Sequence, residues 1–476
     1  MINIRHFDCS ISNFCHGDHD YFIPNLPVPR HLVFLQKTNT TNVKHFRVII
    51  VGSSIAGLTL AHSLQQCGTD FVVLEANTNI APQAGASIGI LTNGARTLDQ
   101  LGIFDVLEEA VAEKTMHYWS GTARRLAKER LQIFEDSLNG SDPQLTTRNG
   151  YPVTFLDRQV ILRILFSHLG EHQNRVHLNK KVVRVETLPN KVMVYCGDGS
   201  NFEGDLVVGA DGVGSTVREE IWRHMESLGL PEYSCVFSIS NPTAGVHPGD
   251  AHRTYAEGCS TLTIGGKGGR IYWFLLTKMD QSSTGSDMPR FNEQDLENQV
   301  AKYLHIPLTP TFRFSDVYEK VETKAYLCLE EAFYQYWSVD RCVCIGDSMH
   351  RMTRNIGQAG NSAIETAVSL VNCLANLIEQ PEGQDLIALQ SINVALEDWQ
   401  KARQPRAKKI LTLANDVTRL KSGATIKDTT ISQYLLPYLS DYLTYLSSDT
   451  RQGRNARVPP APRKDFARHH AVCPTA

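Results

Sequence analysis

The sequence predicts an α/β protein in which a helix-covered, mostly parallel sheet is interleaved with a mostly antiparallel sheet and followed by C-terminal helices. Three features of the 476-residue chain predict this class. Apolar residues 46–51 lead directly into a glycine-bearing turn and a helix. Short alternating runs joined by a glycine-rich turn begin near residue 233, and a long helical region covers residues 359–420. Strand–helix alternation is typical of parallel sheets, whereas hairpins are typical of antiparallel ones.

The first strand–helix–strand unit begins at Phe46. Residues 46–51 are mostly apolar, as expected for a central parallel strand that is covered on both faces. Residues 71–75 form the second strand, and Gly68 ends the helix between them. The apolar side of that helix consists of Leu58, Leu60, Ala61 and Leu64. The unit spans about 30 residues, the size that a β-α-β crossover requires.

The turn between this strand and helix has the spacing of a dinucleotide-binding turn. Gly52 permits the tight turn, Ser54 stands at the second glycine of the G-x-G-x-x-G pattern, and Gly57 allows close packing of helix on sheet. The helix N-terminus then presents free N–H groups to a pyrophosphate. Glu75 closes the second strand, where a carboxylate accepts hydrogen bonds from a ribose hydroxyl. This Rossmann-like unit should therefore hold FAD or NAD rather than NADP.

The antiparallel region is predicted from a hairpin pattern. Residues 260–264 and 271–276 are strand-like, and residues 265–270 between them are rich in glycine. No helix follows this turn, so we interpret it as a hairpin and not as a phosphate-binding loop. Residues 341–345 form a further apolar strand before the long helical region.

Composition excludes several classes of protein. The net charge of −3 and the pI near 6.6 argue against a nucleic-acid-binding protein, which needs a concentrated basic face. The 11 cysteines form no C-x-x-C pair, so we expect free thiols in a reducing compartment and no metal site.

Residues 1–44 are polar and proline-bearing and lack the apolar core of a secretory signal, so we expect a poorly ordered extension. The most apolar long segment, residues 363–378, is interrupted by polar side chains and fits a core helix better than a membrane span. We therefore expect a soluble cytoplasmic protein. A peripheral membrane contact and the oligomeric state stay open.

Two motifs carry a resemblance to a known family. Residues 205–218 contain G-A-D-G-x-x-S-x-x-R, and residues 345–350 followed by residues 357–361 resemble the G-D-A-A-H and G-Q-G-x-N patterns. Both are similar to those of single-component FAD-dependent monooxygenases of the aromatic-hydroxylase type. Within that class the chain most resembles the fungal, paxilline-type enzymes of indole-diterpene and meroterpenoid biosynthesis. The resemblance covers roughly residues 46–465 and includes residues 83–90, 98–104 and 434–438.

The resemblance implies FAD as the cofactor in a glutathione-reductase-like domain. It implies that Asp347 contacts the ribityl and pyrophosphate region, that Arg158 contacts FAD, and that the backbone at Gly89 approaches it. Asp211 and Arg218 correspond to a motif that supports both FAD and reduced nicotinamide. The helix after Gly357 and Gly360 would direct its N-terminal N–H groups toward the flavin.

The predicted division of the chain interleaves the two domains. It has an extension (1–44), the first part of the FAD-binding domain (45–230), a β-sheet substrate domain (231–335), the second part of the FAD-binding domain (336–385), and a C-terminal helical region with a tail (386–476).

The sequence also departs from the family pattern in one loop. Arg354 replaces a common proline, the glycine of the G-Q loop is displaced by one position to Gly360, and Thr366 replaces a common acidic residue. These changes predict a different position for the loop near the flavin. They leave the prediction of FAD binding unchanged.

The resemblance implies a monooxygenase that uses NADPH or NADH and O2 to epoxidise a prenyl side chain on a small, apolar terpenoid hybrid. Tyr233 and Tyr255 are candidates for a polar substrate contact, although buried sheet tyrosines are the commoner explanation. His350, beside the Asp347 motif, fits a structural role better than that of a base. Two alternatives remain: a phenol hydroxylase on the same fold, which needs a base, and a non-catalytic flavin-fold binding protein.

Overall fold

The computed structural model describes most of the chain from Phe46 to Ser422. The described residues are 46–82, 87–103, 106, 109–112, 114–130, 151, 153–222, 233–279, 290–329, 331–353, 356–378, 387–422, 428 and 430–431. The predicted extension at residues 1–44, Arg354 and the family-like segment 434–438 lie outside the described residues.

A six-stranded sheet forms the centre of the nucleotide-binding half, in the order β19-β20-β12-β1-β2-β8. Its strands are β1 (Arg47–Val51), β2 (Asp70–Leu74), β8 (Val176–His177), β12 (Leu206–Gly209), β19 (Ser338–Val339) and β20 (Cys342–Cys344). All neighbouring pairs are parallel except β19 with β20. The predicted strand–turn–helix–strand unit is confirmed as β1, α1 (Ile55–Gln66) and β2, and Gly68 with φ of +67° ends the helical segment.

Helices pack on this sheet because its strands are apolar on both faces. All described residues of β12 are buried, as are four of the five in β1. Helix α1 packs against α10 (Gln358–Ile378), which also contacts α2 (Thr92–Gln100). Further helical elements are α6 (Arg158–Ser167), η3 (Gly170–Arg175), α7 (Thr216–Ile221) and η5 (Gly346–Ser348).

Three small sheets complete this half of the chain. The first contains β3 (Ser87–Ile90), β7 (Thr154–Asp157) and β4 (Val111–Ala112). The second contains β9 (Val182–Thr187), β10 (Val192–Cys196) and β11 (Asn201–Gly204), and the third pairs β18 (Ala332–Phe333) with β21 (His350–Arg351).

The second large sheet has seven strands in the order β17-β13-β16-β15-β14-β5-β6. The strands are β5 (Thr115–Ser120), β6 (Arg125–Arg130), β13 (Tyr233–Ser240), β14 (Asp250–Ala256), β15 (Cys259–Gly265), β16 (Ile271–Lys278) and β17 (Val321–Leu329). The predicted hairpin is confirmed, because β15 and β16 are antiparallel neighbours joined by the short η4 turn (Lys267–Gly269). Strand β5 pairs in parallel with β14 although it lies in the segment that the sequence division gives to the nucleotide-binding part.

The two faces of the seven-stranded sheet have different neighbours. The outer face, which carries Val236, Trp273 and Leu275, packs against α8 (Glu293–Ala301) and α9 (Phe314–Tyr318). Because side chains alternate along a strand, the next residues in each strand form an inner face. The inner face carries Phe237, Ala251, Leu262 and Tyr272, and Phe155 of β7 packs against it.

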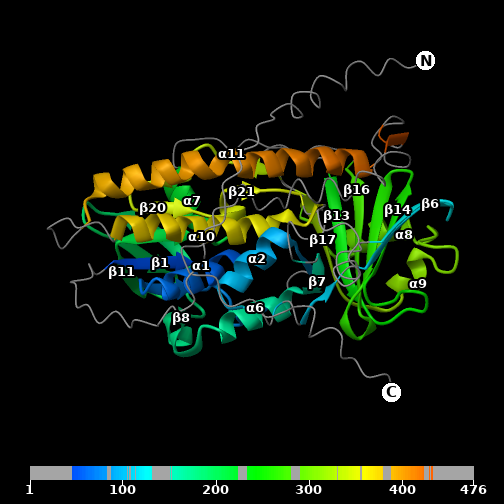
Figure 1. Cartoon of the computed structure of the whole chain (residues 1–476), viewed down its shortest axis with the longest axis horizontal. Coiled ribbons are helices and arrows are strands. Elements are labelled where there is room, and N and C mark those ends of the chain that lie inside the picture. Colours follow the sequence, from blue (N-terminus) through cyan, green and yellow to red (C-terminus); the bar gives the residue numbers. More distant parts are fainter. Residues whose placement is uncertain are drawn as a thin grey trace, which may run out of the picture. The chain divides into compact units, whose positions relative to one another are not determined.

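Helix α11 (Leu389–Ser422) connects the two halves. It contacts α10 and β21 as well as β15 and β16 of the seven-stranded sheet, and Figure 1 shows it running alongside α10 toward that sheet. The helical region expected at residues 359–420 is thus described as two helices, α10 and α11. Among the described helices, none combines the length and the apolar character that crossing a membrane requires.

Candidate active site

The Gly52–Gly57 turn accepts only glycine at its two ends. Gly52 has a φ of +101°, and a Cβ atom there would lie 2.5 Å from the carbonyl oxygen of Ala210. A Cβ atom on Gly57 would lie 1.9 Å from the carbonyl oxygen of Gly52. Ser54 occupies the N-cap of α1, yet its side chain makes no hydrogen bond to the helix. The first-turn N–H groups of α1 are therefore left for an anion, as a pyrophosphate site requires.

Glu75 lies at the end of β2, next to this turn, and is buried. Its carboxylate accepts hydrogen bonds from the backbone N and the hydroxyl of Ser53, at 2.8 and 2.6 Å. It also accepts bonds from the backbone N and the side-chain amide of Asn77, at 2.9 and 2.5 Å. Burial alone would raise the pKa of Glu75, but these hydrogen bonds hold it below its usual value. The ionised carboxylate can accept a ribose hydroxyl once a Ser53 or Asn77 side chain gives way.

Arg158 brings a cation to the same turn. It is the first residue of α6, and its Nη2 donates a hydrogen bond to the Ser54 hydroxyl at 2.8 Å. The preceding residue, Asp157, accepts a hydrogen bond from the Tyr272 hydroxyl at 2.5 Å and pairs with Arg270 at 2.9 Å. Burial, and then the bond to Asp157, raise the pKa of Tyr272, so its phenol stays protonated. The inner face of the large sheet is thereby tied to the start of α6.

The N-terminus of α10 is joined to β3 by Asn361. The Asn361 side chain donates hydrogen bonds to the carbonyl oxygens of Gly89 and Gly357, at 2.9 and 2.7 Å, and accepts one from the backbone N of Leu91 at 3.0 Å. Gly357 has a φ of +66°, and a Cβ atom on Gly360 would lie 2.7 Å from Ile88. The structure thus brings Gly89, Gly357 and Gly360 together, and their role in binding the cofactor stays a prediction.

Asp211 and Asp347 follow adjacent strands of the six-stranded sheet and lie next to the glycine turn. A Cβ atom on Gly52 would be 3.0 Å from the backbone N of Asp211, and the Asp211 carboxylate accepts a hydrogen bond from the backbone N of Thr216 at 2.8 Å. Burial raises the pKa of Asp211. Asp347 lies in η5, where a Cβ atom on Gly346 would be 3.3 Å from that of Ala56 in α1.

Arg218 links these two aspartate motifs through the backbone. Its guanidinium donates hydrogen bonds to the carbonyl oxygens of Gly212, Val213 and Ser348, at 3.4, 2.5 and 3.2 Å. Arg218 thus fixes the backbone of residues 211–213 relative to that of residues 346–348, and its role is to position these two segments.

Tyr233 and Tyr255 lie in the large sheet and not beside the glycine turn. Tyr233 belongs to the inner-face cluster that includes Tyr272, and Tyr255 packs with Tyr118 and with Leu420 of α11. Their side chains are 6% and 2% exposed, respectively. Both tyrosines therefore lie away from the described residues of the Gly52–Gly57 turn, and their catalytic role stays a prediction.

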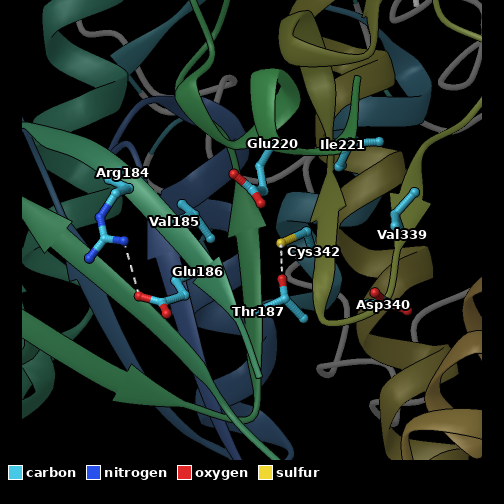
Figure 2. A pocket seen from close by; sticks show the side chains of 9 residues that line it. All are labelled: Arg184, Val185, Glu186, Thr187, Glu220, Ile221, Val339, Asp340 and Cys342. Atoms are coloured by element: carbon cyan, nitrogen blue, oxygen red, sulfur yellow. Dashed lines mark hydrogen bonds and ion pairs between the residues drawn. The ribbon is translucent and has the colours of Figure 1, made fainter. Parts of the chain in front are cut away.

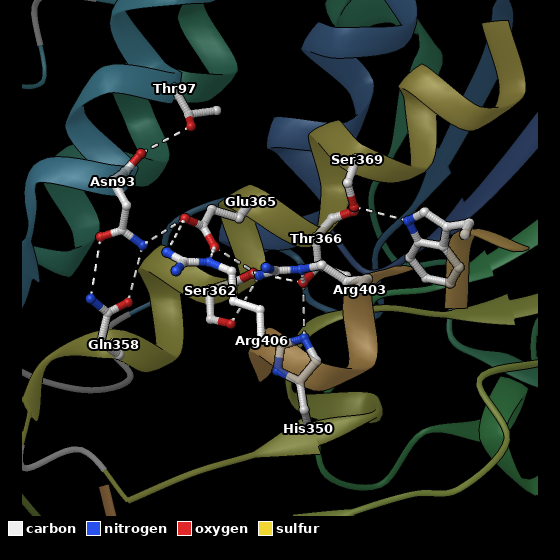
Figure 3. A network of polar contacts seen from close by, with 11 residues as sticks. Asn93, Thr97, His350, Gln358, Ser362, Glu365, Thr366, Ser369, Arg403 and Arg406 are labelled. Carbon is white, nitrogen blue, oxygen red and sulfur yellow. Dashed lines mark hydrogen bonds and ion pairs between the residues drawn. The ribbon is translucent and has the colours of Figure 1, made fainter. Parts of the chain in front are cut away.

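A buried ionic network behind the α10 N-terminus was not predicted from the sequence (Figure 3). Glu365 accepts hydrogen bonds from Arg406 at 2.7 and 2.9 Å and pairs with Arg403 at 2.9 Å. Burial would raise the pKa of Glu365, but the two arginines keep it below its usual value. The only sequence signal was the spacing of Arg403 and Arg406, one turn of α11 apart.

This network reaches the residues that flank the cofactor loop. Asn93 of α2 donates a hydrogen bond to Glu365 at 3.2 Å and exchanges two with Gln358, each near 3.1–3.2 Å. Thr366 bonds to His350 at 3.0 Å and accepts from Arg403 at 3.1 Å. Burial lowers the pKa of His350 to about 3, so its ring is neutral. Thr366, which stands where the family commonly has an acidic residue, is therefore the hydrogen-bond partner of a neutral imidazole.

A separate cavity of about 430 Å³ lies between β9, α7 and the β19–β20 edge of the six-stranded sheet (Figure 2). It is lined by Arg184, Val185, Glu186, Thr187, Glu220, Ile221, Val339, Asp340 and Cys342. None of the predicted cofactor or substrate residues lines it, so it is not the predicted nucleotide site.

Comparison with known proteins identifies the family. Residues 45–411 match the family described as FAD binding domain. The chain belongs to this family. It is 38% identical over 418 residues to the FAD-dependent monooxygenase atmM of Aspergillus flavus, covering 85% of this chain and 84% of that one. It is 39% identical over 409 residues to the FAD-dependent monooxygenase spyC of Aspergillus fumigatus, covering 83% of each.

Solved structures of the same fold include flavoproteins. HpxO of Klebsiella pneumoniae complexed with FAD and uric acid superposes with a TM-score of 0.70 at 21% identity, covering 87% of this chain and 99% of that one. The 2,6-dihydroxypyridine-3-hydroxylase of Arthrobacter nicotinovorans gives 0.63 at 18% identity, covering 80% and 94%. The predicted family, fold class and enzyme class are confirmed: the chain is an FAD-dependent monooxygenase.

The described residues fit FAD. The two glycines leave the space that a pyrophosphate needs at the N-terminus of α1, Glu75 is an ionised acceptor at the end of β2, and Arg158 supplies a cation to the turn. These are the contacts expected of a dinucleotide site.

Proposed function

We propose that this flavoenzyme uses NADPH or NADH and O2 to epoxidise a prenyl or terpenoid side chain of a small apolar substrate. The reaction would consume one reduced nicotinamide, one proton, one O2 and one alkene. It would give the oxidised nicotinamide, water and the epoxide. Bound FAD would supply the redox chemistry, by accepting the nicotinamide electrons and activating O2.

In this proposal the chain's own residues hold and orient the cofactor. The α1 N-terminus and Arg158 bind the pyrophosphate region, Glu75 accepts from a ribose hydroxyl, and Asp347 bonds to the ribityl chain. Asp211, held by its bond from Thr216, supports the nearby backbone. Gly89, Gly357 and Gly360 let the backbone of β3 and α10 approach the flavin ring.

One observation carries the choice of an apolar substrate: the inner face of the large sheet is apolar and meets the cofactor residues through Phe155. Tyr233, Phe237, Ile239, Ile264 and Leu276 lie in this cluster, and all are buried. Phe155 packs against it, and the same ring lies 2.9 Å from a Cβ atom built on Gly89. In this proposal the hydrocarbon side chains of the cluster lie beside an apolar substrate and exclude water, which would protect a reactive oxygen-transfer step.

Tyr233 and Tyr255 have a secondary role in this proposal. Both side chains lie on the inner face of the large sheet, where a hydroxyl could orient a polar group of the substrate. Epoxidation of an alkene needs no enzymic base, so neither tyrosine would have to ionise.

Ring hydroxylation is the second candidate. One structural neighbour is named as a dihydroxypyridine hydroxylase, and such a reaction would use the same cofactor site. It predicts activity on phenols that rises with pH as the phenol ionises, whereas epoxidation predicts activity on unactivated alkenes.

The test is oxidation of NADPH and of NADH by purified, FAD-loaded protein, with and without a farnesylated aromatic compound. The proposal predicts substrate-stimulated oxidation and a product one oxygen heavier, with the oxygen located on the prenyl chain by NMR. Oxygen on the ring would favour the second candidate. Bound FAD that neither nucleotide reduces, with any member of a substrate panel, would contradict the proposal.

A further inference from the structure

Two buried amide side chains join the start of α2 to the start of α10 (Figure 3). Asn93 of α2 donates a hydrogen bond to the side-chain oxygen of Gln358 at 3.1 Å, and Gln358 donates one back to the Asn93 oxygen at 3.2 Å. The two residues are 2% and 0% exposed, although 265 positions separate them in the chain. Because an amide buried without a partner is costly, each of these side chains depends on the other.

Asn93 also joins the amide pair to the charged network behind it. Its side-chain nitrogen donates a hydrogen bond to Glu365 at 3.2 Å, two turns farther along α10 than Gln358. Glu365 is held in turn by Arg403 and Arg406 of α11. Asn93 therefore connects the first turn of α10 to a carboxylate that two buried guanidinium groups fix in place.

The first turns of α2 and α10 also approach each other closely. A Cβ atom on Gly94 would lie 2.0 Å from the side-chain oxygen of Asn361. The same Asn361 oxygen accepts a hydrogen bond from the backbone N of Leu91, the N-cap of α2. Residues 91–94 thus contact the start of α10 at two places, through Asn361 and through Gln358.

We infer that Asn93 is a positioning residue that acts on the flavin through Gln358. The inference rests on the proposed function, in which the backbone at Gly357 and Gly360 lies beside the flavin ring. Asn93 holds the start of α10 in the position from which its first N–H groups, which have no acceptor within the helix, point at the flavin. The partial positive charge of these groups stabilises the negative charge that a flavin gains on reduction, so it raises the reduction potential.

A contact that serves only helix packing predicts a different result. Trp399 of α11 donates a hydrogen bond to Ser369 of α10 at 2.9 Å, so this bond also joins two neighbouring helices. Ser369 lies three turns beyond Gln358 and away from the start of α10. If Asn93 served packing alone, its loss would resemble the loss of the Ser369 hydroxyl and would leave the flavin unchanged.

The test is the reduction potential of bound FAD, measured under nitrogen against a reference dye, without nicotinamide or substrate. Asn93→Leu removes the amide and keeps the number of side-chain heavy atoms. We expect the potential to fall by ~30 mV, which is a ~10-fold smaller equilibrium constant for two-electron reduction. Asn93→Ser, whose hydroxyl ends one bond short of the amide atoms, should lower it in the same way. Ser369→Ala is the matched control and should leave the potential at the wild-type value.

A double-variant cycle tests whether Asn93 acts through Gln358. The shifts in potential of Asn93→Leu and Gln358→Leu should not add, because each substitution breaks the same amide pair. An unchanged potential in both Asn93 variants, an equal shift in Ser369→Ala, or additive shifts in the cycle contradicts the inference. Failure to oxygenate any substrate would contradict the proposed reaction and leave these results unaltered, because the measurement contains no nicotinamide, O2 or substrate.

Discussion

Arg158 donates a hydrogen bond from Nη2 to the Ser54 hydroxyl at 2.8 Å, although the two residues are 104 positions apart in the chain. The bond places a permanent cation beside the N-terminus of α1. It joins the start of α6 to the turn that begins the nucleotide-binding unit. The cofactor site that we propose therefore includes a residue from outside the first strand–helix–strand unit.

Replacement of Arg158 should weaken FAD binding more than folding. We expect Arg158→Met to raise the Kd for FAD ~10- to 100-fold, because a charge-assisted contact with the cofactor is lost, and Arg158→Lys to have an intermediate effect. Fluorescence titration of the apoprotein with FAD measures this. The control is Arg163→Met, an exposed residue on the same helix. An unchanged Kd for Arg158→Met would remove Arg158 from the cofactor site.

Gly57 should tolerate no side chain. A Cβ atom there would lie 1.9 Å from the carbonyl oxygen of Gly52, and backbone cannot move aside cheaply. Gly57→Ala should therefore cost about 3 kcal/mol or more of unfolding free energy and release FAD. Gly214→Ala is the control, since a Cβ atom there would meet no atom within 4 Å beyond its chain neighbours. Urea denaturation and the flavin spectrum of the purified proteins test both, and similar behaviour of the two variants would refute the steric explanation.

Loss of the Glu365 charge should destabilise the junction of α10 and α11. The Glu365 side chain is only 9% exposed and faces two buried guanidinium groups. Glu365→Gln leaves these cations without a counter-charge, which should cost about 3–5 kcal/mol. Glu397→Gln, which breaks an exposed pair with Lys401, should cost less than about 1 kcal/mol. Equal stability of the two variants in denaturant would show that the network is not a source of stability.

Stability should fall as the pH falls below 6.5, because three histidines in the described part of the chain are buried in the neutral form. Burial lowers the pKa of His62 to about 4 and those of His252 and His350 to about 3. The unfolded chain takes up protons at these residues near pH 6.5 while the folded chain does not. Each histidine should therefore cost about 1.4 kcal/mol at pH 5.5 relative to a pH well above 6.5. Urea denaturation at pH 7.5 and 5.5 measures the difference, and His252→Leu should reduce it. Equal stability at both pH values would contradict the assignment.

The glycine turn and its partners could be predicted from the sequence because their constraints are local. Gly52 and Gly57 lie in a fixed pattern between a strand and a helix, and Glu75 follows from the length of the unit. Long-range pairing was harder to predict. Strand β5 pairs with β14, whose residues lie 135 positions later in the chain. Neither strand has a local sequence pattern that names the other as its partner.

The polar groups of the interior could not be predicted for a related reason. Glu365 contacts Arg403 and Arg406 only because α10 and α11 lie side by side, and the sequence shows merely three charged residues. Tyr233 and Tyr255 were chosen by residue type, and the structure gives both a buried position in the large sheet without a contact to the glycine turn.

Transfer of one atom of O2 to the substrate is the step that distinguishes a monooxygenase from a flavin oxidase. It is followed most directly by turnover of the FAD-loaded enzyme with NADPH and a farnesylated aromatic compound under 18O2, with mass spectrometry of the product. We predict a product that gains one oxygen, carried entirely as 18O on the prenyl chain. NADPH oxidation that yields only hydrogen peroxide, or a product whose new oxygen comes from water, would contradict this.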